Sequence, residues 1–112
     1  MSIYIEQIQN RQQAQSNLED TYPFVTELEV PPVDNDLHWH SFDAQFYIVS
    51  GQLRLTDKSG QTHFCGAGDM VTVPTGTLHQ EHSKQGYSIV FGASVTPDEF
   101  GDPVDRPAAT LA

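Results

Sequence analysis

Five histidines, at positions 38, 40, 63, 79 and 82, are the residues of this 112-residue chain best suited to metal chemistry. Two of them, His38 and His40, are separated only by Trp39. On a β-strand this spacing puts both imidazoles on one face, about 6–7 Å apart. Imidazoles so placed can lean onto one divalent ion, which they bind at about 2.0–2.1 Å. The same spacing also fits two exposed strand residues, with Trp39 on the buried face, so a third ligand is needed to decide.

The residues before His79 indicate how a third histidine could be delivered. Gly68 and Asp69 predict a tight turn, and Met70–Val73 reads as a buried strand. The run Pro74-Thr75-Gly76 predicts a second turn. His79 would then stand at the start of the next strand.

These two blocks resemble the two motifs of the cupin superfamily. The first is His38-x-His40 followed by Gly51, and the second is Gly68-x5-Pro74-x-Gly76-x2-His79. The resemblance covers roughly residues 24–95. It implies an all-β fold, an antiparallel jelly-roll β-barrel with little helix, in which the motif histidines bind a divalent metal. On that basis the metal ligands are His38, His40 and His79.

The chain departs from the cupin pattern at three positions. Pro32 stands where a glycine is usual, and Ser83 where the second block usually closes with asparagine. The glutamate ligand of the first block is also missing, because its place falls on Ala44 or Gln45, depending on the register. We therefore expect a three-histidine site, with Gln45 as the alternative fourth ligand. Asp43, the nearest carboxylate, could serve only if a bulge turned it inward.

Strand alternation distinguishes the two registers. If Ala44 points into the barrel, Phe46 and Ile48 point inward with it. If Gln45 points inward instead, Tyr47 and Val49 follow.

Three neutral imidazoles leave a divalent ion with its full charge and with open coordination positions. All-nitrogen coordination suits Fe, Zn, Ni, Cu or Mn better than Mg or Ca. Some cupins with three-histidine sites are Fe(II) oxygenases, so the resemblance implies a dioxygenase-like enzyme that acts on a small chelating organic molecule. The first alternative is a non-catalytic cupin that binds a ligand or uses the metal structurally. A further alternative is a sugar-type isomerase or epimerase.

Few residues could act as a general acid or base. Tyr47 and His82 are the catalytic candidates, although His82 should lie on the opposite face of the strand from His79 and therefore at the rim or surface. Glu81, Tyr87 and His63 complete the inventory. We expect His63 to have a packing or hydrogen-bonding role.

The elements that must position these residues are mostly short strands between turn signals, which is typical of a β-sandwich or barrel. A polar stretch at residues 10–20 has only Ala14 and Leu18 as an apolar stripe and predicts a surface turn or short helix. The expected strands are 3–8 (an edge strand), 24–30, 37–41, 45–50, 52–56, 61–65, 70–73, 78–82 and 87–91.

Length and charge limit the remaining possibilities. The chain suffices for one domain, with a core at about residues 24–95, an N-terminal strand and turn at 1–20, and a Pro- and Asp-rich tail at 96–112 that is either loosely ordered or laid over the barrel. A formal charge of −10 argues against nucleic acid or an anionic membrane as a partner. We expect a cytoplasmic protein, since no signal peptide is visible, and a homodimer, as in many small cupins.

Overall fold

The computed structural model describes residues 1–111 and is built mainly of β-strands. Along the chain the elements are β1 (Ser2–Tyr4), α1 (Arg11–Glu19), β2 (Phe24–Val30), β3 (Val33–Asp34), β4 (His38–Trp39), β5 (Ala44–Asp57), β6 (Thr62–Gly66), β7 (Met70–Val73), β8 (His79–Ser83), β9 (Tyr87–Ala93), the 3-10 turn η1 (Pro97–Glu99), β10 (Arg106–Pro107) and the 3-10 turn η2 (Ala108–Thr110). The predicted strands 24–30 and 70–73 are confirmed at both ends.

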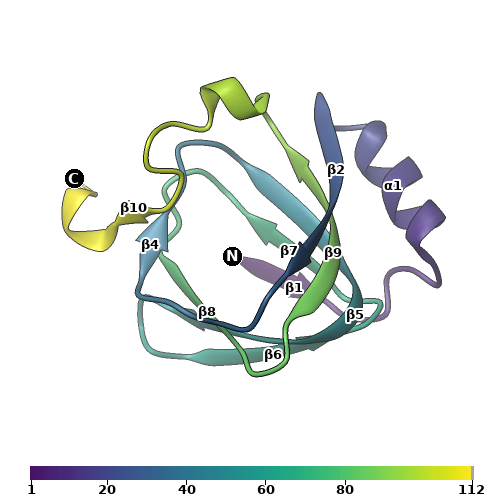
Figure 1. Cartoon of the computed structure of the whole chain (residues 1–112), viewed down its shortest axis with the longest axis horizontal. Helices are drawn as coiled ribbons and strands as arrows, with labels where there is room; N and C mark the ends of the chain where they lie inside the picture. Colours follow the sequence, from purple (N-terminus) through teal and green to yellow (C-terminus); the bar gives the residue numbers. More distant parts are fainter. Residues whose placement is uncertain (112) are drawn as a thin grey trace.

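The strands form two antiparallel sheets that share β5. One sheet has the order β1-β7-β5-β9-β2. In the other, β5 lies between β6 and β8, β8 also pairs with β3 and β4, and β4 pairs with β10. Figure 1 shows the strands curving round a common interior, with α1 outside on one side and the C-terminus on the other. The predicted jelly-roll architecture is confirmed.

Strand β5 passes from one sheet to the other by bending near its middle. Its register with β9 shifts between Ile48 and Ser50, which marks a bulge. Gly51 follows with a φ of 86°, and a Cβ there would lie 2.6 Å from the carbonyl oxygen of Gly86. Glycine is thus required by both conformation and space. We predicted two strands broken at Gly51, and the structure has one bent strand instead.

The inner and outer faces of β5 belong to different cores. Ala44, Phe46 and Ile48 point into the barrel and pack in its main hydrophobic core. Tyr47 lies on the outer face, in a smaller cluster. Of the two registers considered from the sequence, the structure therefore has the one with Ala44 inward, because regular alternation holds over this half of β5.

The single α-helix covers that smaller, outer cluster. Asn10 caps α1, since its side chain accepts a hydrogen bond of 2.9 Å from the backbone N–H of Gln13. Ala14 and Leu18 are buried and form the apolar stripe predicted from the sequence. None of the helices in residues 1–111 combines the length and the apolar character needed to cross a membrane.

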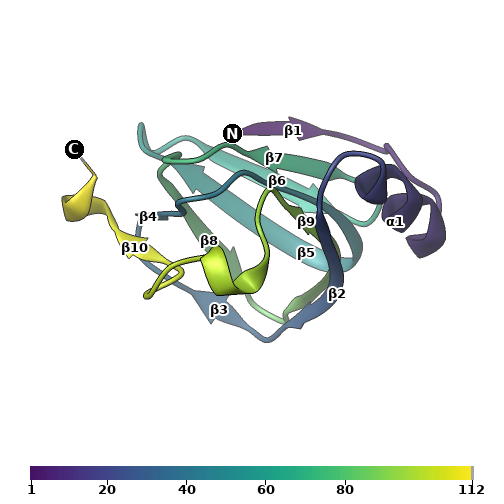
Figure 2. The ribbon, with the colours of Figure 1, turned by 90° about the horizontal axis from the view of Figure 1, so that it is seen from above.

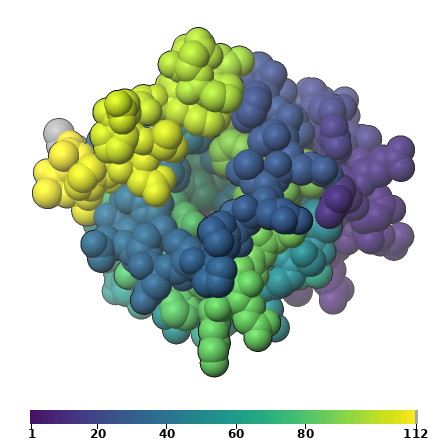
Figure 3. Space-filling model, viewed as in Figure 1, coloured from purple at the N-terminus to yellow at the C-terminus, as the bar shows by residue number. Residues whose placement is uncertain are grey.

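The C-terminal segment is laid over the barrel. Strand β10 pairs with β4, with Arg106 opposite Trp39 and Pro107 opposite His38. Figure 2 shows the segment running along the side of the molecule where β4 lies. In Figure 3 a hollow in this face is bordered by the yellow and yellow-green C-terminal segment. The segment therefore adds a wall to the mouth of the barrel, next to β4, which carries the predicted ligand His38 and is followed directly by His40.

Candidate metal centre

The three predicted ligands come together because β4 and β8 are neighbours. His38 on β4 lies directly opposite His79 on β8, and their ring centroids are 4.3 Å apart. His40 follows the end of β4, with its ring centroid 5.1 Å from that of His38 and 5.0 Å from that of His79. The two sequence blocks thus bring three imidazoles to one point inside the barrel.

Glu81 is a fourth member of the cluster, and we did not predict it as a ligand. It lies two residues after His79 on β8, so both side chains share one face of the strand. Its Oε1 atom is 3.5 Å from Nε2 of His38 and 3.5 Å from Nε2 of His79. The spacing His79-x-Glu81 repeats that of His38-x-His40, and this signal could have found it.

The four side chains fit a single metal ion. Each offers one ligand atom, and these four atoms all lie within 4.8 Å of one another. Ligands held at about 2.1 Å from one ion are separated by about 3 Å at right angles and by about 4 Å across it. Carboxylate and imidazole donors at such separations can hold a divalent ion.

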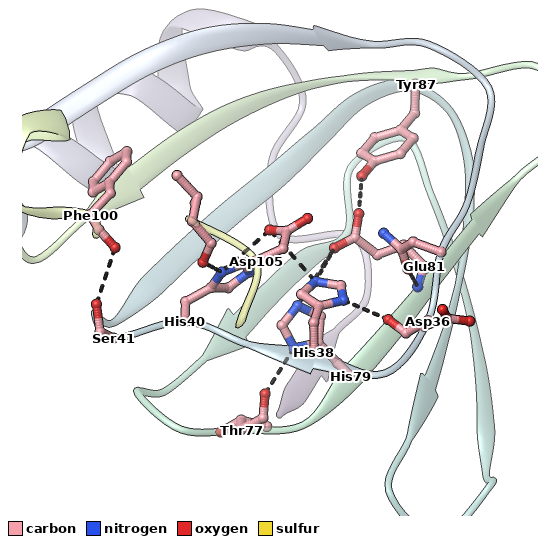
Figure 4. Close-up of polar contacts among 12 residues, drawn as sticks. Asp36, His38, His40, Ser41, Thr77, His79, Glu81, Tyr87, Phe100 and Asp105 are labelled. Carbon is pink, nitrogen blue, oxygen red and sulfur yellow. Dashed lines mark hydrogen bonds and ion pairs between the residues drawn. The ribbon is translucent and has the colours of Figure 1, made fainter. Parts of the chain in front are cut away.

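Backbone carbonyls orient the three rings (Figure 4). Nδ1 of His38 lies 2.8 Å from the carbonyl oxygen of Asp36, and Nδ1 of His79 lies 2.9 Å from that of Thr77. Nδ1 of His40 lies 3.0 Å from the carbonyl oxygen of Val104. A ring that donates from Nδ1 to a carbonyl keeps the lone pair of Nε2 free for a metal.

Nε2 of His38 is compatible with metal binding. Like Nδ1 of His82 and Nε of Arg106, this atom is buried without a well-formed hydrogen bond among the described residues, and Oε1 of Glu81 lies 3.5 Å from it. An unpaired buried polar atom costs about 1–3 kcal/mol in general, so folded proteins rarely keep one without a reason. Coordination to an ion in the cluster would satisfy it.

The neighbouring groups of the cluster shift the pKa values of Glu81, His38 and His40. Burial alone would raise the pKa of Glu81, but the adjacent rings of His38 and His79 outweigh it and hold that pKa well below its usual range. Burial lowers the pKa of His38, but the adjacent Glu81 carboxylate and the hydrogen bond to the Asp36 carbonyl outweigh burial and raise it overall. Burial lowers the pKa of His40. Glu81 is therefore ionised across the ordinary pH range.

Tyr87 holds the outer oxygen of Glu81. Its hydroxyl donates a hydrogen bond of 3.1 Å to Oε2, which leaves Oε1 facing the histidines. Burial, together with the charge of Glu81, raises the pKa of Tyr87 far above its ordinary value. Tyr87 therefore remains a neutral donor and is unsuited to act as a base.

Aromatic side chains form a wall beside His40. The ring of Phe42 stacks on that of His40, with centroids 5.2 Å apart and an interplanar angle of 21°. Phe100, from the C-terminal segment, stacks on Phe42 in turn at 4.3 Å and 22°. Phe91 meets Phe42 edge-on. The surroundings of the cluster on this side are apolar.

Two residues predicted for the site lie outside it. Gln45, the alternative fourth ligand, accepts a hydrogen bond of 2.8 Å from the hydroxyl of Tyr22 on the outer face of the sheet. Tyr47, a catalytic candidate, is buried in the cluster under α1, with its hydroxyl 3.5 Å from Nδ2 of Asn17. Both interpretations were wrong, because the inward position of Ala44 sends its neighbour and every second residue outward.

The other two histidines lie outside the cluster, at half-buried positions on β6 and β8. His82, the second catalytic candidate, pairs with Asp34 on β3 at 3.3 Å, and its side chain is 37% exposed. His63 lies 3.4 Å from a carboxylate oxygen of Asp57. Asp43 accepts hydrogen bonds from the backbone and the hydroxyl of Thr75, at 2.8 Å and 2.9 Å. It therefore holds a turn and does not face the metal cluster.

The comparisons with known proteins agree with the fold. The family model for the cupin domain matches residues 25–93. The chain therefore belongs to the cupin family. No curated protein matches the sequence closely enough to count as a relative.

Solved structures with the same fold are distant in sequence. A DUF861 family protein from Thermotoga maritima is 20% identical, with 81% of this chain and 98% of that one covered and a TM-score of 0.55. The polyketide cyclase RemF from Streptomyces resistomycificus is 26% identical, with 65% and 55% covered and a TM-score of 0.52. A cupin-2 domain protein from Shewanella frigidimarina is 24% identical, with 60% and 65% covered and a TM-score of 0.52. The match thus spans little more than half of the cyclase.

Proposed function

We propose that this cupin binds a divalent transition metal through His38, His40, His79 and Glu81, and that it is a dioxygenase-like enzyme acting on a small organic molecule that chelates through oxygen. The observation that carries the proposal is the convergence of four ligand atoms from β4, β8 and the segment after β4. The unpaired, buried Nε2 of His38 supports it.

The donor set corrects the three-histidine site expected from the sequence. Three imidazoles and one carboxylate suit Fe, Zn, Ni, Cu or Mn, whereas Mg and Ca prefer oxygen ligands. The carboxylate of Glu81 cancels one unit of the ion's charge, so the site is a milder Lewis acid than three histidines alone would give. When bound, the ion would supply a polarising centre for a substrate oxygen and, if redox-active, a place for dioxygen.

The surrounding residues would fix the ligands and keep water out. The carbonyls of Asp36, Thr77 and Val104 set the ring orientations. The stack of Phe42 and Phe100 offers an apolar surface that suits the planar body of an aromatic or conjugated substrate. The cyclase RemF supports a catalytic role, since it is an enzyme on the same fold.

A non-catalytic protein is the second candidate, and the chemistry beside the cluster favours it. Tyr87 contacts Glu81, but its raised pKa makes it unsuited to move a proton at neutral pH. The neighbouring wall of Phe42, Phe91 and Phe100 contributes no acid or base. A protein that only binds a ligand, or that uses the ion to hold its barrel, needs no such group. The raised pKa of Tyr87 counts equally against a sugar-type isomerase or epimerase that would use this residue as its base.

Oxygen uptake tests the proposal against this second candidate. The protein is stripped of metal, reconstituted with Fe(II) without air, and screened for oxygen consumption with thiols, diketones and phenolic acids. We expect substrate-dependent uptake that is lost in His79→Ala and kept in His63→Ala. Stoichiometric zinc in the purified protein, together with no uptake on any substrate, would instead support the non-catalytic alternative.

Homodimer formation and a cytoplasmic location remain predictions. Strand β1 lies at one end of its sheet order, next to β7. Its last residue, Tyr4, is 47% exposed, and Ile5, which follows it, is 68% exposed. An exposed strand edge of this kind can pair with a second copy. Light scattering during size-exclusion chromatography would show whether the protein in solution has twice the mass of the chain.

A further inference from the structure

The C-terminal strap, residues 97–111, is attached to β4, which carries the proposed ligand His38 and is followed directly by His40. The indole N–H of Trp39 lies 3.2 Å from the carbonyl oxygen of Pro107 and 3.2 Å from the hydroxyl of Thr110. The guanidinium of Arg106 lies 5.2 Å from the centroid of the Trp39 ring. Because Trp39 stands between His38 and His40, these contacts fix the strap beside the metal centre.

The strap also reaches the histidines themselves. The carbonyl oxygen of Val104 accepts the hydrogen bond from Nδ1 of His40. Oδ1 of Asp105 lies 3.6 Å from Nδ1 of His40 and 3.9 Å from Nε2 of His38. Figure 4 shows the Asp105 carboxylate between the two rings. Two consecutive strap residues thus face the cluster, one through its backbone and one through its side chain.

The carboxylates of Asp105 and Glu81 differ in their exposure to solvent. The side chain of Glu81 is 20% exposed and held by Tyr87, whereas that of Asp105 is 60% exposed. The Asp105 carboxylate therefore approaches Nε2 of His38, a ligand atom, from the solvent side. Its separation from that atom falls within the range that two ligands of one ion can have, although Asp105 lies outside the group of four ligand atoms that all lie within 4.8 Å of one another.

We propose that Asp105 is a further residue of the metal centre, which covers its solvent-facing side and must be displaced before an outside ligand reaches the ion. This inference rests on the proposed function, since it requires a metal at the four-residue cluster. It assigns a role to the Pro- and Asp-rich tail, which is otherwise only a wall of the barrel.

Selectivity among incoming ligands follows from this position. A carboxylate at the open side repels a simple anion and also competes with it for the ion. A ligand with two oxygen donors gains a second bond to the ion when it replaces Asp105, which offsets the loss. The geometry therefore favours chelating substrates over monodentate anions.

Azide binding to the cobalt form tests this inference directly. Co(II) is added to the metal-free wild type, to Asp105→Asn and to Asp102→Asn, and azide is titrated while the visible absorption of cobalt is followed. Asp102 is exposed and lies in the same strap, so its substitution makes the same change in net charge. Melting temperatures of the metal-free proteins check that all three are folded.

We expect azide to bind at least tenfold more tightly to Asp105→Asn than to the wild type, and Asp102→Asn to stay within about twofold. Cobalt itself should bind Asp105→Asn about tenfold more weakly, as is typical when a group that supports a metal site is removed. Equal azide affinities in the wild type and Asp105→Asn would overturn the inference, as would equal gains in both variants. Failure of the wild type to bind cobalt at all would overturn the proposed function as well.

Discussion

The five histidines of this protein fall into two groups that differ in their surroundings. His38, His40 and His79 each have one ring nitrogen held by a backbone carbonyl and converge on the largely buried carboxylate of Glu81. His63 and His82 lie at half-buried positions, each beside an aspartate, Asp57 and Asp34. A histidine–carboxylate pair alone therefore does not mark a metal site in this fold. The proposed metal site is marked instead by the convergence of several ligand atoms and by the fixed orientation of the three rings.

Substitution of a converging histidine should have the largest effect. His79→Ala removes one of four donors and leaves Glu81 buried beside fewer partners, so we expect loss of stoichiometric metal. His63→Ala is the matched control, because its ring pairs with an aspartate outside the cluster. Elemental analysis of the purified proteins measures both. Equal metal loss in the two variants would mean that the distinction between the groups is wrong.

Removal of the carboxylate should have the next largest effect. Glu81→Gln keeps the size of the side chain and its contact with Tyr87 but removes the negative charge, so we expect zinc to bind about a hundredfold more weakly. Asp57→Asn makes the same change beside His63 and should leave zinc affinity within about twofold. Competition with a chromophoric chelator gives both constants. An unchanged affinity in Glu81→Gln would exclude Glu81 as a ligand.

Metal affinity should fall as the pH is lowered through about 6.5 and below, because only neutral imidazoles bind metal. In the metal-free protein burial lowers the pKa of His38, but the adjacent Glu81 carboxylate and the hydrogen bond to the Asp36 carbonyl outweigh it and raise that pKa overall. Protons therefore compete at His38 at a higher pH than at an ordinary histidine. Zinc titrations at several pH values should show this loss of affinity. An affinity that stays the same between pH 7.5 and pH 5.5 would contradict histidine ligation.

A looser strap should have the smallest effect. Trp39→Phe keeps an aromatic ring under Arg106 but removes the indole N–H that reaches Pro107 and Thr110. We expect a chelator to extract the metal about two- to fivefold faster, with little change in metal affinity. Stopped-flow mixing with excess chelator measures the rate. An extraction rate identical to that of the wild type would show that these two contacts do not control access to the ion.

The sequence predicted the three converging histidines because its two blocks resemble the cupin motifs, whereas the spacing of His38 and His40 alone also fits two exposed strand residues. It also predicted the stripe of Ala14 and Leu18 that α1 buries. Glu81 was missed because the carboxylate was sought in the first motif, between His40 and Gly51, although the chain supplies it from the second. The spacing of His79 and Glu81 on one strand carried that information.

Other features could not be predicted, since they depend on contacts between distant segments. Strand β10 has only two residues, and its pairing with β4 is set by the interactions of Trp39 with Arg106 and Pro107. The composition of the C-terminal segment shows that it is polar, but it does not show where the segment runs over the barrel. The bend in β5 at Gly51 likewise depends on the close approach of Gly86 from another turn.

The most direct test of the metal centre is a crystal structure of the zinc-loaded protein, with diffraction recorded on both sides of the zinc absorption edge. The account predicts one anomalous peak inside the barrel, about 2.0–2.2 Å from Nε2 of His38, His40 and His79 and from Oε1 of Glu81. A fully loaded crystal with no peak between these atoms, or with its peak beside His63 or His82, would contradict it.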